Sequence, residues 1–229
     1  MSGVYPREEA PPVAVPIARR EIGIPVVPLT LPGFLAIPRN AVGVVAFAHG
    51  SGSSRFSLRN RQVAEALHAC RVATLLFDLL SPVEELDRRN VFDIPLLASR
   101  LAAATSHLKT EAELARLPIG YFGASTGAAA ALWAAAGSND IAAIVSRGGR
   151  PDLAGPRLAQ VRAPTLLIVG SRDEHVLDLN RDARRQLRCE ADVQIVEGAT
   201  HLFEEPGTLD VAARLACEWF VRHFTRASR

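Results

Sequence analysis

Cysteine is scarce in this chain, with three residues among 229. Cys70, Cys189 and Cys217 are widely separated, and each falls in a helix-like segment. This pattern indicates neither a disulfide framework nor a C-x-x-C metal or redox site. The sequence therefore predicts a protein of the reducing cytoplasm.

The chain also lacks an excess of charge of either sign. Its 26 lysines and arginines nearly balance its 24 aspartates and glutamates, which gives a formal net charge of +2. Nucleic acids and anionic membranes bind basic stripes or tails, and the charges here are interspersed. We therefore expect no nucleic-acid partner and no membrane partner.

Long apolar segments are few. Residues 1–20 contain several prolines and no apolar core of the kind a signal peptide carries. We expect residues 1–20 to form an N-terminal tail and residues 21–229 to form a single domain. The longest uncharged stretch, 117–139, is long enough to span a bilayer, but it consists mostly of small residues with a proline and several glycines. We interpret it as a buried strand, a turn and a buried helix.

What the chain does have is a regular alternation of strand-like and helix-like segments. Eight of its fifteen prolines occur by Pro38, which predicts edge strands and turns near the start. Later apolar runs are typical of buried strands, and segments of helical spacing separate them. The expected strands are 42–48, 72–77, 118–122, 141–146, 165–170 and 193–197, and the expected helices include 58–70, 92–108, 178–188 and 208–224. This order predicts an α/β protein with a doubly wound, mostly parallel sheet, whose sites form at the carboxyl ends of the strands.

The pentapeptide Gly123-Ala124-Ser125-Thr126-Gly127 stands between an apolar run and an alanine-rich one. A serine at the tip of a sharp strand-to-helix turn has a strained backbone, and side chains two residues to either side would collide. Both of those positions are glycine. The turn exposes the serine hydroxyl, so the sequence predicts that Ser125 is a nucleophile.

Two residues with matching chemistry follow later strands. Asp173 comes after strand 165–170, and His201 comes after strand 193–197. A serine hydroxyl is barely ionised at neutral pH, so it needs an imidazole that accepts its proton and a carboxylate that fixes the imidazole tautomer. The strand ends share one edge of the sheet, and we therefore predict a catalytic triad of Ser125, Asp173 and His201.

Other residues could fill these roles. Glu174 and Asp178 compete with Asp173 as the acid, although an acid at position 178 suits the start of the following helix. His175 is a rival base. Each triad residue, taken singly, could instead be structural. The remaining histidines show no metal spacing, and we expect His49 to brace a loop by hydrogen bonding.

A glycine-rich turn, His49 through Arg55, follows strand 42–48. Such a turn lets backbone amides approach a ligand closely, as stabilisation of an oxyanion requires. A phosphate-binding loop or a plain turn is the alternative, but the Gly-Lys-Ser/Thr ending of a phosphate loop is missing.

Several arginines lie near the edge of the predicted site, namely Arg55, Arg147, Arg150 and Arg172. Together they could bind an anionic group of the substrate. The candidate substrate-binding residues are Gly52, Arg55, Arg147 and Arg150. The alternative is that the arginines fix loops by pairing with nearby acids, namely Asp78, Asp152, Glu204 and Glu205.

These motifs make the chain resemble the α/β-hydrolases and, within them, the dienelactone hydrolase group. The resemblance is carried by residues 47–55, 123–127, 170–173 and 199–203 and extends over roughly 31–224. It implies an α/β-hydrolase fold in which Ser125 is the nucleophile, His201 the base and Asp173 the orienting acid. It also implies an oxyanion hole made by the amides of Ser51 and Thr126, with Gly52 as the substitute if the loop is shifted by one residue.

One departure from this group concerns the nucleophile, because dienelactone hydrolases carry cysteine where this chain has Ser125. A serine needs stronger help from a general base than a thiol does, so we expect a serine carboxylesterase. Connections between strands are short, which argues against a large lid and favours small soluble esters. The expected cycle passes through an acyl-enzyme and requires neither a metal nor an organic cofactor.

Other functions stay open at this point. A thioesterase, a lactone hydrolase or an acyltransferase could use the same triad, because the choice of acceptor depends on pocket shape. A non-catalytic binding module is less favoured, because the motif residues are intact. The oligomeric state is left as monomer or homodimer.

Overall fold

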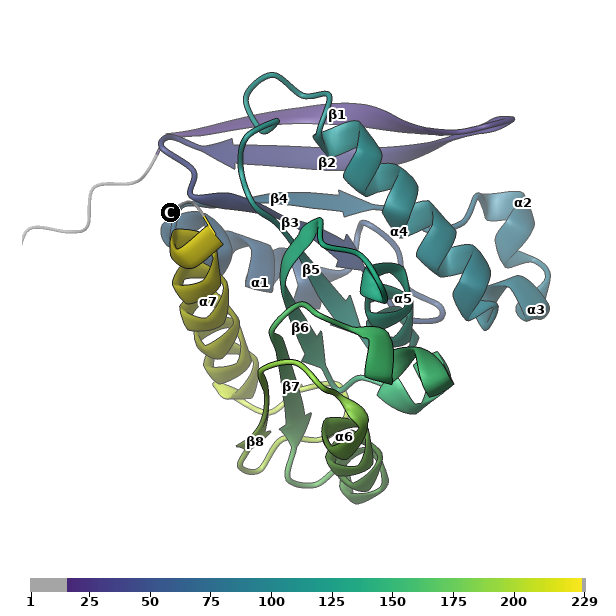
Figure 1. Ribbon diagram of the computed structural model, residues 1–229, viewed down its shortest axis with the longest axis vertical. Helices are drawn as coiled ribbons and strands as arrows, with labels where there is room; N and C mark the ends of the chain where they lie inside the picture. The colour runs from purple at the N-terminus through teal and green to yellow at the C-terminus, as the bar shows by residue number, and fades with distance from the viewer. Residues whose placement is uncertain (1–15, 228–229) are drawn as a thin grey trace, which may run out of the picture.

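A computed structural model describes residues 16–227, which build one eight-stranded sheet with helices on both faces (Figure 1). The strands are β1 (Ile17–Val26), β2 (Leu29–Pro38), β3 (Gly43–Ala48), β4 (Val72–Phe77), β5 (Ile119–Ala124), β6 (Ile141–Arg147), β7 (Thr165–Gly170) and β8 (Ala191–Val196). Their order in the sheet is β1-β2-β4-β3-β5-β6-β7-β8. The β1–β2 hairpin joins β4 in antiparallel fashion, and the six remaining strands run parallel. The predicted doubly wound, mostly parallel sheet is confirmed.

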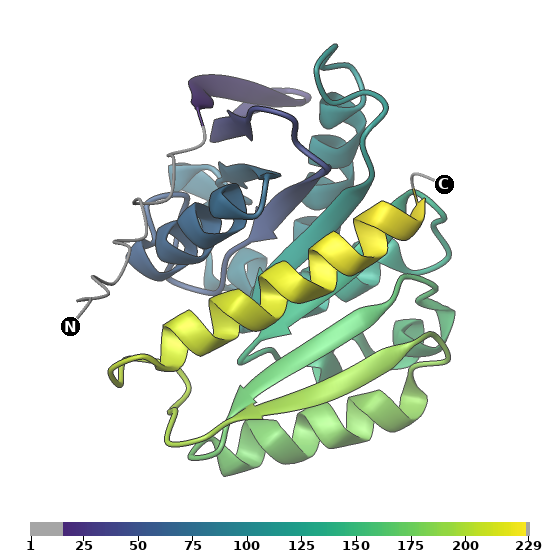
Figure 2. The same ribbon diagram turned by 90° about the vertical axis from the view of Figure 1, so that its left-hand side faces the viewer.

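The helices divide between the two faces of the sheet. One face is covered by α1 (Leu58–Ala69) and α7 (Thr208–Ala227), and α7 crosses the strands in Figure 2. The other face carries α4 (Ile94–Leu108), α5 (Thr126–Ala135) and α6 (Glu174–Gln186). Three short helices lie in connections, namely α2 (Pro82–Glu85), α3 (Arg88–Val91) and the 3₁₀ helix η1 (Pro151–Gln160).

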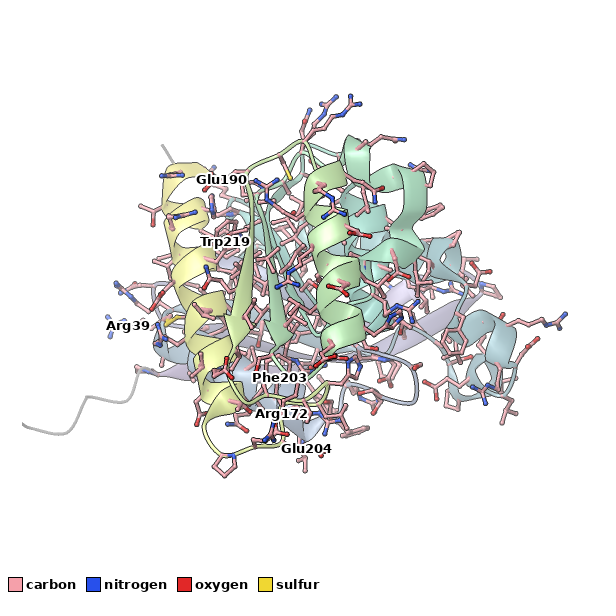
Figure 3. All side chains as sticks on the ribbon, turned by 90° about the horizontal axis from the view of Figure 1, so that it is seen from below. Arg39, Arg172, Glu190, Phe203, Glu204 and Trp219 are labelled. Atoms are coloured by element: carbon pink, nitrogen blue, oxygen red, sulfur yellow. A yellow bond between two sulfur atoms is a disulfide. The ribbon has the colours of Figure 1, made fainter. Side chains whose placement is uncertain are left out.

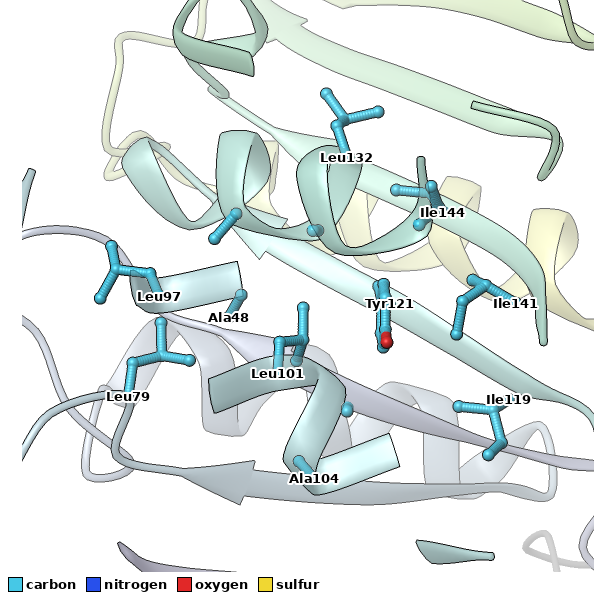
Figure 4. Close-up of a cluster of buried hydrophobic side chains, with 14 of the residues drawn as sticks. Ala48, Leu79, Leu97, Leu101, Ala104, Ile119, Tyr121, Leu132, Ile141 and Ile144 are labelled. Carbon is cyan, nitrogen blue, oxygen red and sulfur yellow. The ribbon is translucent and has the colours of Figure 1, made fainter. Parts of the chain in front are cut away.

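The core on the α4 and α5 side of the sheet surrounds the central strand β5. Figure 4 shows Tyr121 of β5 in one cluster with Leu101 of α4 and Leu132 of α5, and all three are buried. The hydroxyl of Tyr121 shares a hydrogen bond with Thr105, so this buried polar group is satisfied. Burial raises the pKa of Tyr121, which therefore stays neutral. The central strand that ends at the pentapeptide is consequently among the best-packed parts of the protein.

Some expected boundaries need correction. Strand β1 begins at Ile17, so residues 17–20 belong to the sheet and not to a tail, while residues 1–15 lie outside the described residues. The polar connection 81–90 contains α2, whose capping box joins the hydroxyl and amide of Ser81 to the amide and carboxylate of Glu84. Helix α6 begins at Glu174, so Asp178 does not start it.

The cysteine interpretation was wrong for two of the three residues. Cys70, directly after α1, and Cys217 of α7 form a disulfide with their Cα atoms 6.4 Å apart, and Cys189 is free. The two helices pack side by side on one face of the sheet, although the cysteines are 147 positions apart in the sequence. The prediction of a cytoplasmic location rested on unpaired cysteines and loses that support.

The long uncharged stretch folds as predicted into β5 and α5. Within residues 16–227, no helix is both long enough and apolar enough to cross a membrane. The final helix is amphipathic, and its Trp219 and Phe220 are buried against the sheet. Both aromatic side chains therefore pack in the core.

Three buried histidines predict a loss of stability in mild acid. Burial is the main cause that lowers the pKa of His49, His68 and His223 below the ordinary value of 6.5. As the pH falls below 6.5, these histidines bind protons in the unfolded chain but stay unprotonated in the folded chain. The free energy of unfolding therefore decreases. The upper limit of this effect is about 1.4 kcal/mol per pH unit for each histidine.

Urea unfolding measured at pH 7.5 and pH 5.5 checks this expectation, with a lower midpoint expected at pH 5.5. Replacing His68 with glutamine should reduce the difference between the two midpoints. Replacing the exposed His175 with glutamine should leave the difference unchanged. Equal free energies of unfolding at the two pH values would contradict the prediction.

Candidate active site

The three predicted triad residues follow three strands that end at one edge of the sheet. Ser125 comes directly after β5, Asp173 lies three residues after β7, and His201 lies in the loop between β8 and α7. The last two loops are joined, because the amide of Arg172 donates to the carbonyl of Ala199 at 3.0 Å. Figure 3 labels Arg172 and Phe203, which come from these two loops. The fold therefore brings to one place residues that span 76 positions of the sequence.

The backbone of Ser125 has the strained conformation predicted for a nucleophile at a sharp turn. Its φ is 52° and its ψ is −122°, a region that costs a non-glycine residue about 1 to 3 kcal/mol. A Cβ at Gly123 would lie 2.4 Å from Cα of Ala128, and one at Gly127 would lie 2.0 Å from the carbonyl oxygen of Ala48. Side chains at either position would force the turn open. The two glycines are therefore required by close packing.

The imidazole of His201 is held by Asp173. Its Nδ1 lies 2.6 Å from Oδ2 of Asp173, and the Asp173 side chain is 15% exposed. Asp173 is the N-cap residue of α6, but its carboxylate makes no hydrogen bond to that helix and is directed to the histidine instead. This arrangement places the proton on Nδ1 and leaves Nε2 free to accept another.

The rival residues are not in this arrangement. Glu174 and His175 are exposed on the first turn of α6, and Asp178 pairs with Arg181 in the same helix. Among the described residues, none of the three forms a hydrogen bond or ion pair with His201. The geometry therefore favours Asp173 as the acid and His201 as the base.

The segment 147–150, which follows β6, lies against both the serine and the histidine. The amide of Ser125 donates to the carbonyl of Arg147 at 3.3 Å, and the carbonyl of Ser125 accepts from the amide of Arg150 at 3.0 Å. Gly148 has a φ of 52°, and a Cβ there would lie 3.0 Å from the carbonyl oxygen of His201. The sequence analysis placed Arg147 and Arg150 near the site as substrate-binding candidates, but it did not predict these backbone contacts of the segment with Ser125 and His201.

His49 braces the glycine-rich turn, as the sequence predicted. Its Nε2 accepts from the amide of Leu79 at 3.0 Å, and its Nδ1 lies 3.1 Å from the carbonyl oxygen of Gly50. These two bonds require the neutral ring with its proton on Nδ1. Burial lowers the pKa of His49 and keeps the ring neutral. The turn is therefore tied to the end of the neighbouring strand β4.

The two residues predicted for the oxyanion hole contact each other directly. The amide of Ser51 donates to Oγ1 of Thr126 at 3.0 Å. Beside this bond lies a cavity of about 140 Å³. It is lined by His49, Gly50, Ser51, Gly52, Leu79, Leu80, Glu85, Val91, Leu97 and Thr126. Gly52 is thus at the cavity wall, and its φ of 67° lies in a region that favours glycine.

Two of the four candidate arginines already have acidic partners. Arg55 pairs with Asp78, and Arg150 makes two hydrogen bonds of 2.9 and 2.8 Å to Asp152. Two expected pairs did not form, because Glu204 pairs with Arg59 and the carboxylate of Glu205 accepts the amide of Thr200. Arg147 is buried, and Arg172 is exposed. Over residues 16–227, no cluster of three or more His, Cys, Asp or Glu side chains could hold a metal ion.

Solved structures with this arrangement of elements have been described. The chain is similar to the crystal structure of a dienelactone hydrolase from Anabaena variabilis, with 51% identity, a TM-score of 0.87 and coverage of 90% of this chain and 98% of that one. It also resembles Est1E from Butyrivibrio proteoclasticus, with 16% identity, a TM-score of 0.75 and coverage of 90% and 99%. The second likeness concerns the fold alone. Together they confirm the predicted α/β-hydrolase fold.

Two curated relatives, both from Mycobacterium tuberculosis, carry a different name. They are provisionally named phosphoribosyl transferases and are 56% identical to this chain over 209 residues. The match covers 91% of this chain and 47% of each relative, so the chain spans about half of their length. No model of a known protein family matches the chain.

Proposed function

The chain belongs to the dienelactone hydrolase family, and from this premise we propose that it is a serine hydrolase that cleaves small carboxylic esters. The observation that carries the proposal is the bond between His201 and Asp173 at the same sheet edge as the strained Ser125. The family and the fold both support the assignment of hydrolase activity. The preference for esters follows from the serine in place of the family's cysteine.

In the proposed cycle, Nε2 of His201 accepts the proton of the Ser125 hydroxyl as its oxygen attacks the ester carbonyl. The tetrahedral oxyanion is stabilised by backbone amides of the turn and of the helix start, for which Ser51 and Thr126 are our candidates. His201 then protonates the leaving alcohol, and an acyl-enzyme forms. Water activated by the same histidine releases the acid, while Asp173 holds the imidazole in one tautomer throughout.

The amide of Ser51 already has an acceptor, because it donates to Oγ1 of Thr126. An oxyanion bound there would compete with a neutral hydroxyl for this donor. A charged acceptor makes the stronger hydrogen bond, so the exchange favours the charged intermediate over the neutral substrate carbonyl. Gly52 is the alternative donor if the turn shifts.

The substrate is proposed to be small and uncharged near the reacting carbonyl. The cavity beside the oxyanion turn measures about 140 Å³, and its lining includes Leu79, Leu80 and Leu97. Two of the candidate arginines are neutralised by acids, and the carboxylate that lines the cavity belongs to Glu85. These features favour short neutral acyl groups over anionic ones.

The transferase name of the mycobacterial relatives is not carried over to this chain. More than half of each relative lies outside the match, whereas the match to the Anabaena dienelactone hydrolase covers nearly all of both chains. We propose that a phosphoribosyl transferase activity of those relatives resides in their unmatched part. Calorimetric titration of this chain with phosphoribosyl pyrophosphate should accordingly show no binding.

Hydrolysis of nitrophenyl esters tests the main proposal. We expect turnover of acetyl and butyryl esters, slower turnover of a hemisuccinate ester of similar size, and a single covalent adduct with a serine-reactive phosphonate. Mass spectrometry should locate the adduct on Ser125. Absence of both turnover and adduct would refute the enzymatic interpretation. Turnover of the corresponding thioester or lactone at a higher kcat/KM would replace the ester proposal by that alternative.

A further inference from the structure

Arg147, the last residue of β6, is a buried cation without a counter-ion. Its exposed fraction is 6%, and none of the acids in the described part of the chain lies within ion-pair distance. Burial, with a smaller contribution from Arg59, lowers its pKa to about 10, so it is still protonated at neutral pH. An unpaired buried charge is costly, which calls for an explanation in terms of what the side chain contacts.

The guanidinium of Arg147 contacts the two residues that follow His201. It donates from one terminal nitrogen to the carbonyl of Leu202 at 3.5 Å, and it lies 5.6 Å from the centre of the Phe203 ring. Phe203 is 2% exposed and has a φ of 56°, a strained conformation for a bulky residue. The arginine thus packs against the strained turn that fixes the end of the histidine loop.

The backbone of the same residue contacts the nucleophile. The carbonyl of Arg147 accepts the amide of Ser125 at 3.3 Å, so one residue touches both the serine elbow and the histidine loop. The next residue, Gly148, lets the histidine loop approach closely, because a Cβ there would lie 3.0 Å from the His201 carbonyl oxygen and 3.6 Å from its Nδ1. The distance between serine and histidine therefore depends on this strand end.

We propose that Arg147 is a positioning residue that holds the His201 loop at the correct distance from Ser125. This inference rests on the proposed function for its catalytic consequence, but the position of the loop can be measured without any activity. It replaces the expectation that Arg147 binds substrate. Its guanidinium contacts Leu202 and Phe203, and Arg147 does not line the cavity beside the oxyanion turn.

Electrostatics explain why an arginine suits this place. A buried guanidinium can donate to a backbone carbonyl and face an aromatic ring at the same time, because it is planar and carries five donors. The carbonyl of Leu202 and the ring of Phe203 present partial negative charge to it. A lysine could keep the bond to the carbonyl but would lose the planar contact with the ring.

The test compares Arg147→Met and Arg147→Lys with Arg157→Met as a matched control. Arg157 is a half-buried arginine of η1 whose guanidinium lies 4.9 Å from the centre of the Trp133 ring of α5. Hydrogen exchange is measured on the full chain for the peptide that covers residues 199–205. We expect Arg147→Met to speed exchange in this peptide by about tenfold or more and Arg157→Met to leave it unchanged.

Kinetics with butyryl nitrophenyl ester supply the second measurement. We expect Arg147→Met to lower kcat by about 10- to 100-fold with KM within about twofold, because the substrate pocket is untouched while the base is displaced. Arg147→Lys should recover part of the loss, and it serves as the test variant if Arg147→Met does not fold.

The two measurements separate the failure of this inference from that of the proposed function. Unchanged exchange at residues 199–205 in both Arg147 variants would overturn the positioning role whatever the activity. A raised KM with an unchanged kcat would also overturn it, because it would indicate substrate binding. Inactivity of the wild-type chain would refute the proposed function, and faster exchange in the variants would still support the positioning of the loop.

Discussion

Replacing Ser125 with alanine is expected to lower kcat for ester hydrolysis by about 10⁶-fold and to abolish labelling by a serine-reactive phosphonate. The reason is that the acyl-enzyme cannot form without the hydroxyl, and a water molecule in its place lacks the fixed geometry of the elbow. The protein should fold normally, because Ser125 donates and accepts its turn-forming hydrogen bonds through the backbone. Substrate binding should be retained, so KM should change by less than about tenfold.

Ser146 provides a matched control for this substitution. It is a buried serine near the end of the adjacent strand β6, and its hydroxyl has no hydrogen-bond partner among the described residues. Ser146→Ala should leave kcat and phosphonate labelling unchanged and should not lower stability, because it removes an unsatisfied polar group. Full activity of Ser125→Ala would show that another residue is the nucleophile, and the site assignment would then be wrong.

Much of the fold could be predicted because its strands are buried on both faces. Strands β3, β4, β5 and β7 appear in the sequence as uninterrupted apolar runs, and all of their residues are buried. The outer strand β1 lacks such a run, because only Ile24 and Val26 of its residues are buried, and its first four residues were expected to belong to a tail. Strand patterns thus reveal the centre of a parallel sheet better than its edge.

Short helices and distant pairings were missed for physical reasons. Helix α2 is stabilised mainly by the capping box of Ser81 and Glu84, a local signal that the polar composition of the loop obscured. The disulfide between Cys70 and Cys217 depends on how α1 packs beside α7, which no local pattern records. The positive φ of Phe203 is likewise not signalled by its residue type, because glycine is the residue that usually adopts this conformation.

The candidate site likewise contains residues that the sequence predicts and residues that it does not predict. Ser125, Asp173 and His201 could be found because chemistry restricts the residue types and the fold restricts their positions to strand ends. Their supports could not be found, since Arg147 and Gly148 act through contacts with segments more than 50 positions away. Arg147 was therefore assigned to substrate binding from its charge and its place at the edge of the predicted site. Its burial, and the paired state of Arg55 and Arg150, are what changed that interpretation.

The second large effect is expected from Asp173→Asn, which should lower kcat by about 10⁴-fold while KM changes little. The carboxylate accepts the Nδ1 proton of His201 over 2.6 Å and so keeps Nε2 unprotonated and able to accept the serine proton. An asparagine amide can donate to Nδ1 instead, which stabilises the opposite tautomer and leaves the proton on Nε2. It also removes the negative charge that stabilises the imidazolium in the transition state. Steady-state kinetics with the butyryl ester measure both constants.

Glu174→Gln is the matched control, because Glu174 is the adjacent acid and is exposed on the first turn of α6. Its loss should change kcat by less than about twofold. The reverse pattern, a large loss with Glu174→Gln and a small one with Asp173→Asn, would move the acid role to Glu174 and would mean that the bond between His201 and Asp173 is not the one used in catalysis. Equal small effects would argue that His201 is oriented by its loop alone, in which case the support from Arg147 and Gly148 would have to supply what the carboxylate does not.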